Sequence, residues 1–319
     1  MTSNQASASP TTRSGFPSGS LEASSPRYAE KAIFAFLAFC GVLSVGVTTA
    51  IVISLLMPTI DFFRQVTLEQ FFLDTTWAPR QATGRFGVWP VVVGTLNIVI
   101  WALLVAIPIG LASAIYLSEY ASPRTRKIVK PVLEVLAGIP TVAIGLFAFF
   151  ALNPAARLAL PFLDWSGIFS VGVAGVAVGL MTVPLVASIS DDAMRAVPRA
   201  LREGAYGLGA NKFKVSLRVV FPAAISGIVA SIVLAGSRAV GETMVVYIAA
   251  GRTPNLTFDP TESVQTMTAY IAGTATGDIP TGTLDYDTIF AVGTLLFVMT
   301  LVLNVLAIRL VRRFREAYE

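Results

Sequence analysis

Residues 191–224 read DDAMRAVPRALREGAYGLGANKFKVSLRVVFPAA, a polar stretch that lies between two long apolar segments. A helix can begin at Pro198, because proline lacks the N–H that the first turn of a helix leaves without a partner. Gly207 and Gly209 then interrupt the helical pattern, and apolar residues return at helical spacing before Pro222. The stretch predicts two short amphipathic helices joined at a glycine corner, a shape that suits the groove of another protein.

The composition places the chain in a lipid bilayer. Of its 319 residues, 55% are hydrophobic and only 13% are charged, and the mean hydropathy is +0.72. A soluble globule of this size needs more polar surface than that. The lone cysteine, Cys40, excludes an intrachain disulfide, and the absence of histidine excludes a Cys/His metal cluster, so we expect no metal site. The net charge of +4 is too small to indicate nucleic-acid binding.

Apolar segments recur along the chain, each with the roughly 20 helical residues that are needed to cross about 30 Å of hydrocarbon. They predict an all-α membrane protein with six transmembrane helices. These spans are predicted near 32–57, 88–118, 129–152, 168–190, 223–250 and 287–310. Residues 191–222, which we call the corner element, lie between the fourth and fifth spans. The whole transmembrane domain is predicted over residues 29–319, with membrane lipid as a partner.

The basic residues are distributed unevenly between the two sides of the predicted membrane. Seventeen of the 23 Lys and Arg residues lie in the N-terminal segment, the corner element, the loop after the second span and the C-terminus, or at the span ends next to them. Only five lie in the opposite loops, and Arg238 alone lies inside a span and away from its ends. Because positive charge is enriched on the cytoplasmic side, both termini are predicted to be cytoplasmic.

The N-terminal segment, residues 1–28, is rich in Ser, Thr, Pro and Gly and has almost no large aliphatic residues. It is predicted to be a disordered cytoplasmic tail, because it cannot bury enough apolar surface to order itself. It also lacks the apolar segment of a cleaved secretory signal, so the first span is expected to serve as the insertion signal.

The loop over residues 251–286 is too polar to span a membrane. It carries four acidic residues and one arginine, and a short interfacial helix is expected around Tyr270. Two interpretations stay open: a solvated acidic loop, or part of a docking surface for an extracytoplasmic partner.

The corner element resembles the EAA loop of ABC importer permeases. The positions that carry the resemblance are Glu203, Gly204, Ala205, Gly209 and the Phe221-Pro222 pair. Gly204 stands where that pattern has alanine, and Phe221 stands where Ile or Leu is commoner. The resemblance implies the type I ABC importer permease fold, with this loop inserting into an ATPase subunit. The chain has no G-x-x-x-x-G-K-[ST] phosphate-binding loop, so ATP would be used by partner subunits and no cofactor by this chain.

Three further stretches are similar to the permeases of the phosphate-specific (Pst) importer, in particular the PstC-type subunit. They are FGVWP at 86–90, LEVLAGIPTVAIG at 133–145 and SRAVGETMVV at 237–246. The similarity implies a subunit that forms the phosphate pathway in a bacterial inner membrane. It also implies four kinds of partner: a second, PstA-type permease, two ATPase subunits and an extracytoplasmic phosphate-binding protein.

Arg238 and Glu242 lie inside the predicted fifth span, where each charge costs about 2.5–3.5 kcal/mol to insert. In a continuous helix their i, i+4 spacing places them on one face, close enough to pair. The pair could fix helix packing, or it could line the pathway, with Arg238 offering a guanidinium to an oxyanion and Glu242 holding that guanidinium. Lys130 and Glu134 have the same spacing and predict an ion pair at the cytoplasmic interface. Pro140 predicts a kink in the third span.

Other functions remain open on the residues alone. A permease for sulfate or molybdate would share the corner element and the charge. A proton-coupled secondary transporter could use Glu242 as a relay, although no inverted repeat is evident. A membrane enzyme is the weakest alternative, since Arg238 and Glu242 by themselves make no reaction centre.

Overall fold

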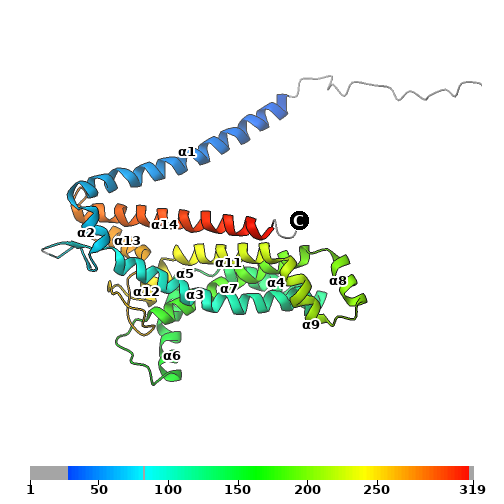
Figure 1. Cartoon of the computed structure of the whole chain (residues 1–319). Helices are drawn as coiled ribbons and strands as arrows, with labels where there is room; N and C mark the ends of the chain where they lie inside the picture. Colours follow the sequence, from blue (N-terminus) through cyan, green and yellow to red (C-terminus); the bar gives the residue numbers. More distant parts are fainter. Residues whose placement is uncertain (1–27, 82, 316–319) are drawn as a thin grey trace, which may run out of the picture. The chain divides into compact units, whose positions relative to one another are not determined.

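The computed structural model describes residues 28–81 and 83–315, and these are mostly helical (Figure 1). The chain divides into two units after Val52, inside the first helix. In the first unit, residues 28–52 form an uninterrupted apolar helix whose described side chains are almost all exposed. The predicted tail lies outside the described residues except for Tyr28. The rest of the fold belongs to the second unit.

The long helices are α1 (Tyr28–Gln65), α3 (Trp89–Ile115), α4 (Pro123–Ala137), α7 (Val171–Ala196), α11 (Ile225–Val240) and α14 (Leu284–Arg315). The shorter ones are α2 (Leu68–Leu73), α5 (Thr141–Phe147), α6 (Asn153–Ala159), α8 (Arg199–Gly207), α9 (Lys212–Val215), α10 (Phe221–Ala223), α12 (Met244–Ala249) and α13 (Met267–Ala275). Three π-helical turns continue α3, α5 and α9, namely η1 (Tyr116–Tyr120), η2 (Ala148–Leu152) and η3 (Ser216–Val220). In the described residues the only strands are β1 (Trp77–Ala78) and β2 (Arg85–Phe86), which pair antiparallel.

Helices α3 and α7 form the centre of the second unit and pack along each other. Glycines allow this close approach. A Cβ at Gly175 would lie 2.4 Å from the Trp101 Cβ, and one at Gly179 would lie 2.7 Å from the Ala102 carbonyl oxygen. Small residues are common where membrane helices pack, because lipid provides no hydrophobic force between them and close backbone contact has to supply the attraction. The main apolar core surrounds this helix pair.

The structure confirms the all-α fold with membrane-spanning helices. Five helical segments are long and apolar enough to cross a membrane, and a bent pair formed by residues 212–223 and 225–240 makes a sixth. The two helices of that pair meet at 72°, close to Pro222. The large apolar side chains that stay exposed on these helices are what a surface facing lipid or another permease requires.

The bounds predicted for the third span, 129–152, are wrong. Helix α4 ends at Ala137, Gly138 caps it, and α5 begins after Pro140. The segment that can cross a membrane runs instead from Thr141 to Ala159. The helix breaks here because Pro140 has no N–H to donate and favours an extended residue before it, so the predicted kink is a complete interruption.

The fifth span, predicted at 223–250, is also not one helix. Helix α11 ends at Val240, with Gly241 as its C-cap, and α12 begins at Met244. Residues 241–243 are therefore unwound within the predicted span. Non-helical backbone at this depth is tolerated only where it is buried in protein or lines a water-filled cavity.

The end of α1, the segment that follows it and the 251–283 loop make a compact layer at the end of the bundle away from α8 and α9 (Figure 1). Its core is aromatic: Phe62, Phe71 and Trp77 pack edge to face, and Tyr270 of α13 packs against Trp77 with ring centroids 5.0 Å apart. Helix α13 is the short helix that the sequence predicts around Tyr270.

Candidate translocation and docking sites

Arg238 lies in the last turn of α11 and is half-buried. The predicted ion pair with Glu242 does not form, because the helix ends at Val240 and the i, i+4 geometry is lost. Across residues 28–81 and 83–315 the guanidinium of Arg238 has no carboxylate within ion-pair distance. Its neighbour Ser237 donates a hydrogen bond to the Asn304 side chain of α14 at 2.7 Å, which ties this turn of α11 to the last helix.

Glu242 lies in the unwound segment and is 8% exposed. Its carboxylate accepts a hydrogen bond from the backbone N–H of Val245 at 3.2 Å, in the first turn of α12. Its carbonyl oxygen accepts one from the Thr268 hydroxyl at 2.7 Å, so α13 is tied to the same residue. A carboxylate at a helix N-terminus satisfies a donor that the helix leaves free and is favoured by the helix dipole. Glu242 therefore organises the break in the fifth span.

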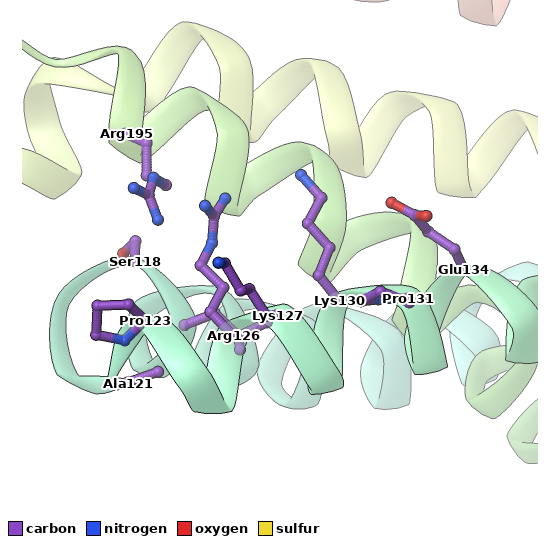
Figure 2. A pocket seen from close by; sticks show the side chains of 10 residues that line it. Ser118, Ala121, Pro123, Arg126, Lys127, Lys130, Pro131, Glu134 and Arg195 are labelled. Atoms are coloured by element: carbon purple, nitrogen blue, oxygen red, sulfur yellow. The ribbon is translucent and has the colours of Figure 1, made fainter.

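A basic cleft of about 620 Å³ lies between η1, α4 and the end of α7, and Figure 2 shows its lining side chains. Two of its four lining cations are neutralised. Arg126 donates to the Asp191 carboxylate at 2.6 Å, and Lys130 donates to Asp192 at 2.5 Å. Asp191 is 0% exposed, whereas Asp192 is 59% exposed. The two aspartates begin the predicted corner element but belong to the last turns of α7, which extends to Ala196.

The predicted pair between Lys130 and Glu134 is wrong. Both side chains project from α4 in the same general direction but stay apart, as Figure 2 shows, and Lys130 turns to the α7 aspartates instead. Two carboxylates at 191 and 192 give a cation a stronger field than one exposed glutamate on its own helix. Sequence spacing could not reveal this, since α4 and α7 are distant in the chain.

The helix–corner–helix that the sequence predicts within the corner element is present. Helix α8 ends at Gly207, and Gly209 adopts φ +78°. The Gly209 N–H donates to the Tyr206 carbonyl and the Ala210 N–H donates to the Ala205 carbonyl, the two hydrogen bonds of a Schellman cap. Only glycine adopts this left-handed conformation without a steric penalty. The next helix, α9, is then capped by Asn211, whose side chain accepts from the Lys214 N–H at 2.9 Å.

The inner side of the corner element is anchored to the bundle. Val215, Val220 and Ala224 pack with Met194 and Val197 at the end of α7. Among residues that the sequence did not single out, Arg202 is the main anchor: it donates to the Glu119 carboxylate at 3.1 Å and to the carbonyl oxygens of Val197 and Met194. In the sequence, Arg202 is one cation among many on the cytoplasmic side, and only the tertiary structure shows that it is largely buried.

The outer side of the corner element is open. Glu203, Gly204 and Gly209 are exposed, and a Cβ at either glycine would meet no neighbouring atom within 4 Å. Leu208, at the corner, is 92% exposed, and Phe213 is also exposed. The other predicted site residues, Ala205 and Pro222, are partly buried on the inner side. Protruding apolar side chains on an anchored element form a surface that another protein can cover.

The chain belongs to the family of binding-protein-dependent transport system inner membrane components, the membrane subunits of ABC transporters, whose family model matches residues 106–317. This establishes a membrane protein that works with other ABC transporter subunits and carries no ATPase site of its own. The range includes every predicted site residue.

Several relatives match over most of the chain. One is the probable ABC transporter permease protein YqgH of Bacillus subtilis, which is 30% identical over 82% of this chain and 84% of its own length. The phosphate transport system permease protein PstC of Haemophilus influenzae is 31% identical over 89% of this chain and 92% of its own. PstC 1 of Mycobacterium tuberculosis is 33% identical over 76% and 81%.

The fold is shared with solved ABC importers. A bacterial alginate ABC transporter, solved in complex with an alginate-bound periplasmic protein, has a chain that superposes with a TM-score of 0.61 over 90% of this chain and 98% of its own. An inward-facing MetNI methionine transporter gives a TM-score of 0.51 over 72% and 94%. At 17% and 16% identity, these two structures show the fold alone.

Proposed function

We propose that this chain is a PstC-type permease subunit of an ATP-driven importer that carries inorganic phosphate across a bacterial inner membrane. The observation that carries the proposal is Arg238, a guanidinium without an ion-pair partner in the described residues, next to an unwound segment of a membrane span. PstC permeases from two organisms, each more than 30% identical to this chain over most of its length, support phosphate as the substrate.

In this proposal Arg238 contacts the phosphate in transit. A charge inside a membrane span is costly, and such residues normally mark a substrate or ion pathway. The planar guanidinium offers pairs of parallel N–H donors to phosphate oxygens, an arrangement that a lysine ammonium lacks. Arg238 is only half-buried in the single chain, so its exposed side can face a pathway shared with a second permease of PstA type. Glu242 does not bind the guanidinium. Its role is indirect: its carboxylate caps α12 and so stabilises the unwound segment that precedes this helix.

The corner element is the proposed contact with one of two ATPase subunits. Its outer side carries Glu203, Gly204 and Gly209, its corner presents Leu208, and its inner side reaches α7 through Arg202, Ala205 and the bend at Pro222. A displacement of the corner by the ATPase subunit would therefore be transmitted to α7 and α11. ATP is bound by the partner subunits, and this chain binds no cofactor. An extracytoplasmic phosphate-binding protein delivers the substrate, and both termini face the cytoplasm, as the distribution of basic residues supports.

The deciding experiment is uptake of labelled phosphate, sulfate and molybdate by proteoliposomes that contain the whole complex and its binding protein. We expect ATP-dependent phosphate uptake that falls by at least about 100-fold in Arg238→Gln while assembly and ATP binding persist. Preference for sulfate or molybdate would overturn the substrate. Uptake that needs a proton gradient and no ATP would instead favour a secondary transporter that uses Glu242.

Two variants of the corner element test the coupling role. Gly209→Asp breaks the left-handed corner, and Glu203→Lys reverses a charge on the outer side. Both variants should uncouple ATP hydrolysis from uptake without preventing membrane insertion. Gly204→Ala is the control for the first, since alanine is the residue that the EAA pattern has at this position and it suits a helix. Normal ATP-driven uptake in both Gly209→Asp and Glu203→Lys would contradict the role of the corner element.

A further inference from the structure

A second pocket, of about 420 Å³, lies in the layer at the end of the bundle away from the corner element. Its walls come from the β1–β2 hairpin, from the segment that follows α12, and from α13. The side chains that line it with polar atoms are Trp77, Arg80, Gln81, Tyr247, Arg252, Gln265, Tyr270 and Thr274. No acidic residue lines it.

The two arginines in this pocket have no carboxylate to neutralise them. In the described part of the chain neither Arg80 nor Arg252 forms an ion pair. Three acids of the layer are engaged elsewhere, with polar partners. Asp74 binds Arg85 at 3.0 Å, Asp259 accepts from the Thr261 hydroxyl at 2.7 Å, and Glu262 accepts from the Asn255 amide at 2.7 Å. Asp285 and Arg80 both act electrostatically on the buried Tyr270 hydroxyl, with opposite effects. The pocket is thus a positively charged cavity.

Trp77 supplies a buried donor to the same cavity. Its side chain is 3% exposed, and its indole N–H has no acceptor among the residues that the structure describes. The ring cannot turn away easily, because it packs edge to face against Phe71 and Tyr270. A buried donor without an acceptor is destabilising, so such groups are rare in native proteins. Trp77 lines the pocket, and an anion that reached its N–H from there would satisfy this donor.

The second arginine is held in place by aromatic packing. The Arg252 guanidinium lies 4.2 Å from the centre of the Tyr247 ring, a cation–π contact. Tyr247 in turn packs on Gly273, where a Cβ would lie 3.1 Å from the ring. Gly251, with φ +100°, turns the chain immediately before Arg252. The positive charge is therefore positioned by the fold, although Arg252 itself is exposed.

Both inner walls of the pocket are linked to the break in the fifth span. Helix α12, which carries Tyr247, begins two residues after Glu242. Helix α13, which carries Thr274, is tied to the Glu242 carbonyl through Thr268. The pocket walls are thus connected to the unwound segment next to Arg238.

We propose that this pocket is an anion site that receives phosphate before it enters the pathway. The proposal rests on the function proposed above and adds a residue set to it, with Arg80, Arg252 and the Trp77 N–H as donors. Because no carboxylate lines the pocket, only neutral acceptors such as the Gln81 and Gln265 amide oxygens are present to accept from a P–OH group, and these distinguish phosphate from sulfate less strongly than a charged acceptor. Selection between the two then belongs to the binding protein or to the pathway itself.

The test measures phosphate binding to the assembled complex in lipid nanodiscs without the binding protein, by the line broadening of the ³¹P resonance of inorganic phosphate. We expect wild type to bind phosphate weakly, as a transport site must, with sulfate competing within about fivefold. Arg80→Gln with Arg252→Gln should weaken binding by about 10- to 100-fold. Trp77→Phe, which keeps the packed ring but removes the donor, should weaken it by about threefold or more. Arg64→Gln is the control, since Arg64 is an exposed arginine of the same layer that pairs with Asp61 and does not line the pocket.

Each outcome of this experiment either supports the anion site or overturns it. The proposal is overturned if wild type binds no phosphate, or if the double arginine variant binds it as tightly as wild type. It is also overturned if that variant keeps phosphate binding but loses affinity for the binding protein, because the pocket would then be a docking surface for an acidic side chain. If wild type binds phosphate and sulfate in the pocket but ATP drives no phosphate uptake, the proposed function fails and the anion site stands.

Discussion

Two positively charged cavities lie at opposite ends of the second unit, and they treat their charges differently. In the cleft between α4 and α7, Arg126 and Lys130 are held by Asp191 and Asp192. In the pocket beside α12 and α13, Arg80 and Arg252 face no carboxylate in the described residues. Arg126 and Lys130 therefore join two helices, whereas Arg80 and Arg252 stay available to an anion.

A count of basic residues therefore does not locate a binding site. An arginine that is paired with a buried carboxylate contributes to packing and offers little field to a ligand. An unpaired arginine, positioned by an aromatic ring, keeps its field and its donors. Pairing is therefore expected to decide how a substitution in either cavity acts.

The largest effect is expected from removing the buried carboxylate of the α4–α7 cleft. Asp191→Ala leaves Arg126 without its 2.6 Å partner in a partly buried position, and should lower the free energy of unfolding by about 1–3 kcal/mol. The midpoint of thermal unfolding of the detergent-solubilised chain measures this. The control is Asp192→Ala, which removes an exposed carboxylate and should cost under about 1 kcal/mol. Equal losses in both variants would show that burial does not distinguish the two pairs.

A new carboxylate in the pocket beside α12 and α13 should convert it into the paired kind of cavity. Gln265→Glu places a negative charge in a wall that faces Arg80 and Arg252, and should weaken phosphate binding by about tenfold. The readout is ³¹P line broadening on the assembled complex. Gln265→Met separates the added charge from the lost amide, and it should change binding by less than about threefold. A similar loss in both variants would assign the effect to packing.

Loss of a paired cation in the α4–α7 cleft should matter less to transport. Lys130→Gln removes a charge that Asp192 already neutralises, so phosphate uptake should stay within about twofold of wild type. Arg252→Gln is the matched change in the other cavity and should reduce phosphate binding by about tenfold, and with it phosphate uptake below saturating phosphate. A larger loss of uptake in Lys130→Gln than in Arg252→Gln would reverse the comparison between the two cavities.

The smallest effect is expected on the local stability of the 251–283 loop, through Asp259. Hydrogen bonds from the Thr261 hydroxyl and backbone N–H hold the pKa of Asp259 below its usual range. A lowered pKa in the folded state means that the stabilisation is complete above the pKa of the unfolded chain and is lost as pH falls through the folded pKa. Hydrogen exchange of the loop, corrected for intrinsic rates, should therefore quicken between about pH 5 and about pH 3. Asp259→Asn should remove this pH dependence; its persistence in the variant would place its origin elsewhere.

The sequence predicted the class of fold because hydrophobic length and helix signals are local. Six apolar segments gave the spans, and Pro198, Gly207 and Gly209 gave the two helices and the corner between them. It misplaced the third span and missed the break in the fifth, because hydropathy averages over a window and does not register where Pro140 or Gly241 ends a helix.

The membrane fold, the corner element and the presence of charges within or beside the spans all follow from the sequence. The pairing of those charges follows only from the tertiary structure. Arg238 and Glu242 are separated by a helix end, Lys130 turns from Glu134 to Asp192, and Arg202 becomes a buried anchor. Pairing depends on contacts between segments that are distant in the chain. In a medium of low dielectric constant, those contacts decide whether a charge holds the fold together or stays available to a ligand.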